Sequence, residues 1–404
     1  MTRRLVTALA CLATACGDAN FTVSGVVVDD GRGPVAGATV SIPGHAAVST
    51  DAQGRFSVPG VERPFDLTLV STADAMGVVY RGLTRRDPAP RLFRVRSIKH
   101  GSVSGTVSGG AGYPQPPGRV TLVVFISSFG ADQVLAAADG SFSIPDVRWR
   151  DGSPTVVGRL HAVQMDVGPA GPVAYQGWGD SGAITLSEGL PLAGQDIALE
   201  SPVVSATIDG SASIPAGYAL TGRELDLALG EGPWRMVLLA DASAEATFSF
   251  VSPLVSGAHY DMTASARSAA GDVIGGGRFG LPGVARGLSL VLPAAPALDQ
   301  PAEGAAAGYG TVFSWGAYGT PGAVYHVAFQ PRNPGDPEIH VVTMGTTTAL
   351  PDLRAMGLGL PAAGYLWSVH AEGPWDDIES SLEYNLPSFH TFGQTAPRSF
   401  SAVP

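Results

Sequence analysis

Histidine and acidic side chains are the residues of this sequence that could hold a metal ion or exchange protons. The eight histidines are scattered singly, with no HExxH or HxH pair to place two ligands on one zinc ion. The Asp-Gly turns at 29–31, 139–140 and 151–152 lack the alternating carboxylates of a calcium loop. The sequence therefore predicts no metal site and no cofactor.

Ser181 lies in the string Gly179-Asp180-Ser181-Gly182, which also surrounds the nucleophile of chymotrypsin-like proteases. Such catalysis needs a histidine base and an orienting aspartate. No matching histidine context precedes this string, and Ala183 replaces the glycine that would follow. We interpret the string as a glycine-rich turn and predict that the chain is not an enzyme.

The N-terminus carries the sharpest signal in the sequence. Arg3 and Arg4 precede eleven apolar or small residues, from Leu5 to Ala15, and Cys16 follows them. A bilayer-spanning helix needs about 20 apolar residues, so this shorter run is typical of a signal peptide. The sequence therefore predicts export.

Ala13, Thr14 and Ala15 ahead of Cys16 resemble a lipobox, the recognition sequence of lipoprotein signal peptidase. The resemblance implies that residues 1–19 are a lipoprotein signal peptide and anchor, with Cys16 as the lipidated first residue of the mature chain. The alternative is an ordinary signal peptide that is cut after Ala15 and leaves Cys16 unmodified.

The cysteine content supports the lipid anchor. Cys11 and Cys16 are the only cysteines, so cleavage leaves one thiol and no internal disulfide. Gly17 rather than Asp follows Cys16, so the inner-membrane retention signal of many Gram-negative lipoproteins is absent. We expect an outer-membrane lipoprotein that faces the periplasm or the cell surface and contacts the membrane through its anchor.

Composition indicates a multidomain, all-β chain. Its 404 residues include 53 Gly and 32 Pro, while 45% of residues are apolar and alternating Val, Thr, Ser and Leu runs recur. Charged residues make up 15% and sum to -11, and Lys99 is the only lysine. Because no basic stripe exists, we predict no nucleic-acid partner.

Residues 20–99 share a pattern of glycine, apolar and turn residues with a known domain. The matching blocks are Gly25-x-Val27-x-Asp29, Gly33-x-Val35-x-Gly37-Ala38-x-Val40 and Thr50-Asp51-x-x-Gly54-x-Phe56. They resemble the carboxypeptidase regulatory-like domain, a transthyretin-like β-sandwich that is an accessory to the enzymes that name it. We expect Phe56 in the core of this module and Gly54 at positive φ in the preceding turn.

The pattern recurs along the chain. Residues 139–147 repeat 53–61 in character, which predicts a second regulatory-like β-sandwich over 100–201. The motif at Phe248-Ser249-Phe250 echoes the first module more weakly and predicts a third, divergent β-sandwich over 202–293.

The segment 294–404 follows a Pro/Ala linker, lacks the motifs of the first modules and resembles a fibronectin type III domain. The resemblance rests on Phe313-Ser314-Trp315 and on residues 325–329, 346–350 and 360–371. We expect Tyr365, Trp367, Val369 and Ala371 on one strand face. The Tyr365 hydroxyl is expected to bond back to nearby backbone, as in the tyrosine corner of such sandwiches.

Loop aromatics are the remaining candidates for binding. Trp149, Tyr175 and Trp178 could form a platform for sugar rings, whose C–H faces pack on aromatic rings. The alternative is that they fold over the ends of the sandwich cores.

The fold class predicted by these patterns is all-β, with tandem β-sandwich domains of transthyretin-like and immunoglobulin-like type. The predicted function is a lipid-anchored, non-catalytic structural or interaction protein of the cell envelope, whose partners are envelope proteins or polysaccharide. A carbohydrate-binding surface lipoprotein is the alternative. Because each module has its own core, we expect an extended row of modules that unfold independently.

Overall fold

The structure is a computed structural model. It describes residues 20–94, 98–150, 152–169, 171–230, 234–383 and 386–403. The regular secondary structure of this part of the chain is almost entirely β-strand, with one short helix, α1 (Ile378–Leu382), and one 3-10 turn, η1 (Arg354–Met356). The all-β fold class is confirmed. No helix among these residues is long and apolar enough to cross a bilayer.

We keep the expected segment 20–99 as the first module, and its strands form two layers. One layer pairs β1 (Phe21–Val26) with β5 (Arg55–Val61) and β2 (Val28–Asp29) with β8 (Arg91–Leu92). The other layer has the order β4 (Val48–Ser49), β3 (Thr39–Ser41), β6 (Phe65–Ser71), β7 (Met76–Leu83). Apolar residues of β1 alternate with polar ones, so one face of the strand is buried and the other exposed. Phe56 is buried and Gly54 has a φ of 71°, as predicted.

The second module (100–201) repeats this plan with longer strands. One layer contains β9 (Lys99–Gly109), β12 (Ser141–Trp149), β15 (Pro191–Leu192) and β16 (Ile197–Leu199). The other has the order β11 (Ala131–Leu135), β10 (Arg119–Ser127), β13 (Thr155–Gly168), β14 (Gly171–Ser187).

The third module (202–293) is built in the same way. Its smaller layer has the order β20 (Thr247–Pro253), β17 (Ser205–Ser213), β23 (Ala285–Val291). Its larger layer has the order β19 (Met236–Asp241), β18 (Tyr218–Ala228), β21 (His259–Ser268), β22 (Val273–Leu281).

The C-terminal module (294–404) also has two layers. The smaller has the order β24 (Leu298–Gln300), β26 (Val312–Trp315), β29 (Thr347–Ala349). The larger contains β28 (Glu338–Thr343), β27 (Val324–Pro331), β30 (Gly364–Gly373) and β31 (Phe389–Gln394), with β32 (Arg398–Val403) and β25 (Ala305–Gly308) joined to β30.

A glycine opposite a phenylalanine marks the same place in the first three modules. The register pairs are Gly25 with Phe56, Gly105 with Phe142, and Gly210 with Phe248. All three phenylalanine rings are buried. In the first module the glycine leaves room for the ring, since a Cβ on Gly25 would come within 2.7 Å of the Phe56 ring. At Gly105 and Gly210 an added Cβ would instead meet Gln195 and Leu288. The repeated sequence motif thus corresponds to the same strand pairing in each of the first three modules.

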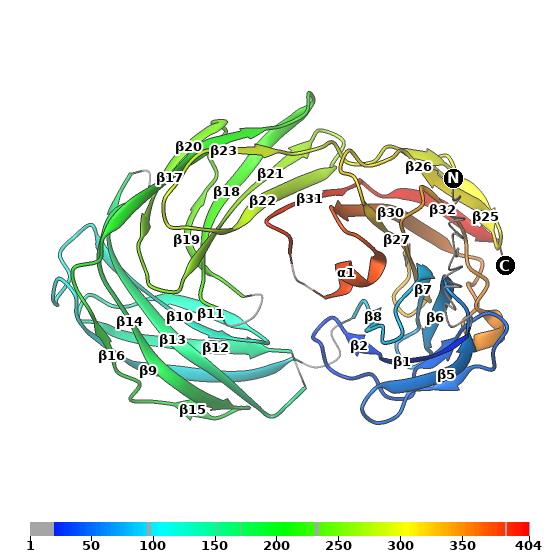
Figure 1. Ribbon diagram of the computed structural model, residues 1–404, viewed down its shortest axis with the longest axis horizontal. Coiled ribbons are helices and arrows are strands. Elements are labelled where there is room, and N and C mark those ends of the chain that lie inside the picture. The colour runs from blue at the N-terminus through cyan, green and yellow to red at the C-terminus, as the bar shows by residue number, and fades with distance from the viewer. Residues whose placement is uncertain are drawn as a thin grey trace, which may run out of the picture.

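The modules follow one another around a ring, with α1 on its inner side (Figure 1). Strand β7 of the first module pairs in parallel with β28 of the C-terminal module, and β22 of the third pairs with β31. The larger layers of these three modules therefore form one continuous sheet. The first core also includes C-terminal residues such as Val342 and Ile378. The expected extended row of independent modules is wrong, because open strand edges at both ends of the chain pair with each other.

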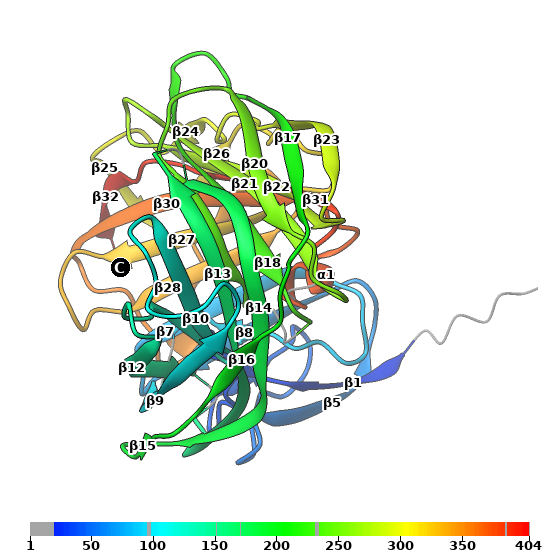
Figure 2. The same ribbon diagram turned by 90° about the vertical axis from the view of Figure 1, so that its left-hand side faces the viewer.

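The second module closes the ring on its remaining sides. Its long strands β13 and β14 run toward the third module (Figure 2), and Val163 and Tyr175 on them share a core with third-module residues such as Phe250. Gly31 of the first module lies against the second module, where an added Cβ would meet the Arg150 carbonyl oxygen at 2.1 Å. Only a residue without a side chain allows this approach.

The joint between β22 and β31 also depends on glycine. Gly275 faces Phe392 in the register, and a Cβ there would lie 2.5 Å from the aromatic ring. The missing side chain lets the ring of the neighbouring module lie directly over the strand.

The C-terminal module confirms one expectation about its core and corrects another. Tyr365, Trp367, Val369 and Ala371 are all completely buried on one face of β30. The Tyr365 hydroxyl, however, has no hydrogen-bond partner, and its ring stacks on Phe400. The tyrosine-corner prediction is therefore wrong.

A different tyrosine hydroxyl is bonded to the backbone at this place. The oxygen of Tyr309 accepts a hydrogen bond from the backbone N–H of Leu360 at 2.6 Å. This contact joins segments 51 residues apart, so a local sequence pattern could not reveal it.

Candidate ligand-binding cavity

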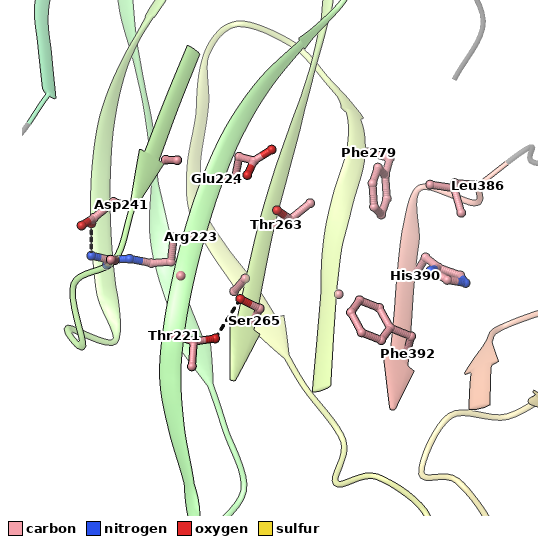
Figure 3. A pocket seen from close by; sticks show the side chains of 15 residues that line it. Thr221, Arg223, Glu224, Asp241, Thr263, Ser265, Phe279, Leu386, His390 and Phe392 are labelled. Atoms are coloured by element: carbon pink, nitrogen blue, oxygen red, sulfur yellow. Dashed lines mark hydrogen bonds and ion pairs between the residues drawn. The ribbon is translucent and has the colours of Figure 1, made fainter. Parts of the chain in front are cut away.

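Two adjoining hollows lie against the larger layer of the third module and β31. Their volumes are about 990 Å³ and about 550 Å³, and Phe279 and Leu386 border both. We call the two together the central cavity. Figure 3 shows the smaller hollow, with side chains from β18, β21, β22 and β31 around it.

All four modules contribute to the larger hollow. Its lining includes Asp30 of the first module, Arg150 of the second, Trp234 of the third and Glu383 of the C-terminal module. The Arg150 guanidinium lies over the Trp234 ring, 5.8 Å from its centroid. The hollow exists because the ring brings these loops together.

Two carboxyl groups of β18 lie beside the central cavity: Glu224 lines the smaller hollow, and Asp226 is buried next to it. Leu225 and Leu227 on this strand point into the apolar core of the third module. Because side chains alternate along a strand, Glu224 and Asp226 take the opposite, cavity-facing side. Asp226 is the register partner of Asp261 on β21. It therefore lies between Glu224, which lines the smaller hollow, and Asp261, which lines the larger one.

Asp261 is fully partnered, whereas Asp226 is not. Asp261 Oδ2 accepts a hydrogen bond from Arg235 Nε at 2.5 Å, and its Oδ1 accepts one from the backbone N–H of Gly280 at 2.9 Å. Asp226 is only 8% exposed, and its Oδ1 has no hydrogen-bond partner. Most buried polar atoms are hydrogen-bonded, so this carboxyl oxygen is an exception that calls for a cause.

The electrostatics of the carboxyl group follow from this environment. Burial, the negative charge of Glu224, a side-chain hydrogen bond with Glu224 and the charge of Asp261 together raise the pKa of Asp226 to about 9, against the opposing charge of Arg235. Asp226 is therefore protonated at neutral pH in this structure.

The far wall of the smaller hollow is an ion pair whose charges cancel. The buried Arg223 donates to the Asp241 carboxylate and to the carbonyl oxygen of Thr247 (Figure 3). Opposite it, the rings of Phe279 and Phe392 form an apolar wall (Figure 3). The two hollows thus combine aromatic faces with five carboxyl groups and four guanidinium groups, those of Asp30, Glu224, Asp241, Asp261, Glu383, Arg32, Arg150, Arg223 and Arg235.

The structure does not bring the predicted aromatic residues together. Trp149 is completely buried in the second core and donates from Nε1 to the Ser153 carbonyl oxygen at 2.8 Å. Tyr175 is buried in the core shared with the third module, where its hydroxyl donates to the carbonyl oxygen of Val251 at 3.2 Å. Neither ring presents a face to a ligand.

The other two predicted residues lie elsewhere. Trp178 is partly buried and stacks on His161, with ring centroids 5.6 Å apart. The predicted lipidation site, Cys16, lies outside the described residues.

The Gly-Asp-Ser-Gly string is part of strand β14, so the prediction of a glycine-rich turn is wrong. Asp180 is the register partner of His161 on β13, which brings a serine, a histidine and an aspartate near one another. The Ser181 hydroxyl, however, donates to the Gly182 carbonyl oxygen and accepts from the Leu160 N–H. Both His161 ring nitrogens are buried without a partner. This geometry lacks the relay of a catalytic triad.

Within the described ranges, His, Cys, Asp and Glu side chains do not gather in any group of three or more that could hold a metal ion.

Sequence reasoning missed the carboxylates of the central cavity. A usable signal was present in Glu224-Leu225-Asp226-Leu227, where acids and leucines alternate as in a strand with two different faces. Such a pattern is also typical of an ordinary half-exposed strand. Only the closure of the ring places the acidic face in an enclosed space.

The fold and the cavity together define a protein of tandem β-sandwich modules arranged around a shared hollow. No family model matches the chain, and no curated protein matches it.

Solved structures with some similarity to this chain exist. The Bacillus anthracis TIE protein is 9% identical over 68% of this chain and 50% of its own, with a TM-score of 0.17. A putative cell adhesion protein from Parabacteroides distasonis is 12% identical over 42% of this chain and 76% of its own, with a TM-score of 0.16. The FN1–FN3 domains of chicken CNTN1 are 12% identical over 69% of this chain and 90% of their own, with a TM-score of 0.15. The chain spans about half the length of the first of these, and similarity at this level carries no argument about function.

Proposed function

We propose that this chain is a lipid-anchored protein of the cell envelope that acts by binding rather than by catalysis, with the central cavity as its binding site. The observation that carries the proposal is the convergence of loops from all four modules on one hollow of about 990 Å³. Concave sites that combine apolar and aromatic side chains with polar groups are the usual form of ligand sites.

The anchor part of the proposal is supported by the sequence around Cys16 and by its distance from the fold. Strand β1 begins at Phe21, five residues after Cys16. An extended chain of that length reaches at most about 18 Å. A lipid on Cys16 would therefore hold the ring close to the membrane surface, where envelope proteins and polysaccharide are the partners within reach. Gly17 after the cysteine favours the outer membrane.

The non-catalytic part is supported by the geometry of the one motif that suggested an enzyme. Ser181 is hydrogen-bonded to backbone groups and His161 is buried without a partner, so neither group is set up to attack a substrate. The carbohydrate-binding alternative loses its support, because Trp149 and Tyr175 are core residues.

Intact-mass spectrometry of the membrane fraction tests the anchor, because both signal-peptide alternatives leave Cys16 as the first residue. We expect the mature chain in that fraction with the added mass of a diacylglyceryl group and a fatty acid. The Cys16→Ser variant should lack this mass and leave the membrane. An unmodified mature chain would refute the anchor.

A further inference from the structure

Neighbouring carboxyl groups at the central cavity differ in their partners. Asp261 is paired with Arg235, whereas Asp226 has a buried oxygen without a hydrogen-bond partner. Glu224 lies on the same side of β18 and adds a second negative charge nearby. A buried carboxyl oxygen without a hydrogen-bond partner is costly to the fold even when the group is protonated, so its presence points to a partner that the fold does not itself supply.

The charged groups around these acids determine which charge that partner should carry. Arg235 is committed to Asp261, and Arg223 is committed to Asp241. His259, which also lines the larger hollow, is exposed and lies at the far end of β21. Arg32 and Arg150 border the larger hollow from the first and second modules, and Arg150 lies over the Trp234 ring. His390 borders the smaller hollow, with its Nε2 3.5 Å from Glu372. No cation among the described neighbours is hydrogen-bonded to Asp226 Oδ1. The vicinity of Asp226 therefore favours a positive group.

The aromatic walls fit the same conclusion. Phe279 and Phe392 border the smaller hollow with Glu224 (Figure 3). Aromatic faces attract ammonium and guanidinium groups and also pack against the carbon chain that carries them. In the larger hollow this preference is already visible, because the Arg150 guanidinium lies over the Trp234 ring.

We propose that the central cavity binds an organic cation, a primary ammonium or guanidinium group, with Asp226 and Glu224 as its counter-charges and the rings of Phe279 and Phe392 against its carbon chain. The inference rests on the proposed function, since it takes the central cavity as the binding site. The cation comes either from a small amine or from a lysine or arginine side chain of a peptide.

Binding of a cation should release a proton. In the structure Asp226 holds a proton, because its pKa is raised to about 9 by burial and by its acidic neighbours. A cation favours the ionised form, so at pH 7 binding should expel up to one proton. Affinity should then rise about tenfold per pH unit as long as the pH stays below that pKa.

The test is titration calorimetry of the mature full-length chain with butylamine, butylguanidine, butanol and butyrate. Measurements in buffers of different ionisation enthalpy count the released protons. Both cations should bind, and neutral butanol and anionic butyrate should bind at least tenfold more weakly. The Asp226→Asn and Glu224→Gln variants should each lose at least tenfold in affinity. The exposed Asp299→Asn variant is the control and should bind like the parent.

A tripeptide Gly-Lys-Gly completes the experiment. Tighter binding of the tripeptide than of butylamine assigns the cation to a peptide, and the reverse assigns it to a free amine. Cations that bind no better than butanol would overturn the inference, as would a folded Asp226→Asn variant with unchanged affinity. A chain that binds cations but carries no lipid refutes only the anchor. A lipidated chain that shows no binding of the cations refutes only this inference.

Discussion

The backbone N–H of Thr84 donates a hydrogen bond to Glu379 Oε1 at 2.6 Å, which links the first module to a helix 295 residues later in the chain. The N–H of Arg85 donates to the same oxygen at 2.7 Å, and its guanidinium pairs with Asp377. Glu379 is 3% exposed and lies in the first turn of α1. One buried carboxylate thus helps to hold the first module against the C-terminal module.

Replacing Glu379 by alanine should weaken this closure. The change leaves two backbone N–H groups without their acceptor, which costs about 2 to 3 kcal/mol. Urea unfolding should show this loss of stability, and hydrogen exchange should increase in β7 and β28. The exposed Glu245→Ala variant is the control and should behave like the parent. A Glu379→Ala protein as stable as the parent would contradict the role of this contact.

Truncating Phe56 to alanine should destabilise more than the first module. Removal of a buried phenylalanine side chain costs about 3 to 5 kcal/mol. The first core includes Val324 and Val342, which belong to β27 and β28. Exchange protection should therefore fall in these C-terminal strands as well as in residues 20–94. Increased exchange confined to the first module would instead support independently unfolding modules.

Sequence patterns predicted local features of the fold well. The alternation in β1, the burial of Phe56 and its counterparts, and the inward face of β30 follow from side-chain periodicity, which depends on neighbouring residues alone. Gly210 would have strengthened the prediction of the third copy of the repeat. It pairs with Phe248 in the same way as Gly25 pairs with Phe56.

The ring and its cavity could not be predicted in this way. Strand β7 has apolar residues on both faces, which indicates a strand inside a larger sheet but does not identify β28 as its neighbour. The pairing joins Val79 to Val341, and no local signal connects positions so far apart. Asp226 acquires its unusual environment only after the modules have closed around it.

Acid should destabilise the chain through His161. Burial lowers the pKa of His161 to about 4, from its ordinary 6.5. The unfolded chain therefore takes up a proton between these values while the folded chain does not, so stability falls as the pH drops from 6.5 to about 4. The loss attributable to this group is on the order of 3 kcal/mol.

The His161→Phe variant tests this prediction, because a phenyl ring keeps the stacking against Trp178 but cannot titrate. Its free energy of unfolding should depend less on pH over that range than the parent's. The exposed His100→Phe variant should keep the parent's dependence. An unchanged pH profile for His161→Phe would show that His161 is not the group responsible.

Asp226 should destabilise the chain as the pH rises, whereas His161 destabilises it as the pH falls. Its pKa in the fold is raised from 3.8 to about 9, so the folded chain holds a proton that the unfolded chain releases. Stability from this group is complete below 3.8 and is lost as the pH rises toward about 9. The Asp226→Asn variant should therefore melt at a higher temperature than the parent at pH 8, with a smaller difference at pH 5. A variant that is less stable at pH 8 would contradict the unpaired carboxyl.

Small-angle X-ray scattering of the mature chain tests the closed ring most directly, and the cavity depends on that ring. A compact chain of this length has a radius of gyration of about 21 Å, and a ring around a hollow should lie a few ångström above that value. A linear row of four modules, each with a radius of gyration of about 13 Å, would give more than about 35 Å. We predict a value in the twenties and a distance distribution with one maximum. A value above about 35 Å, with a long tail in the distribution, would contradict the ring and remove the cavity with it.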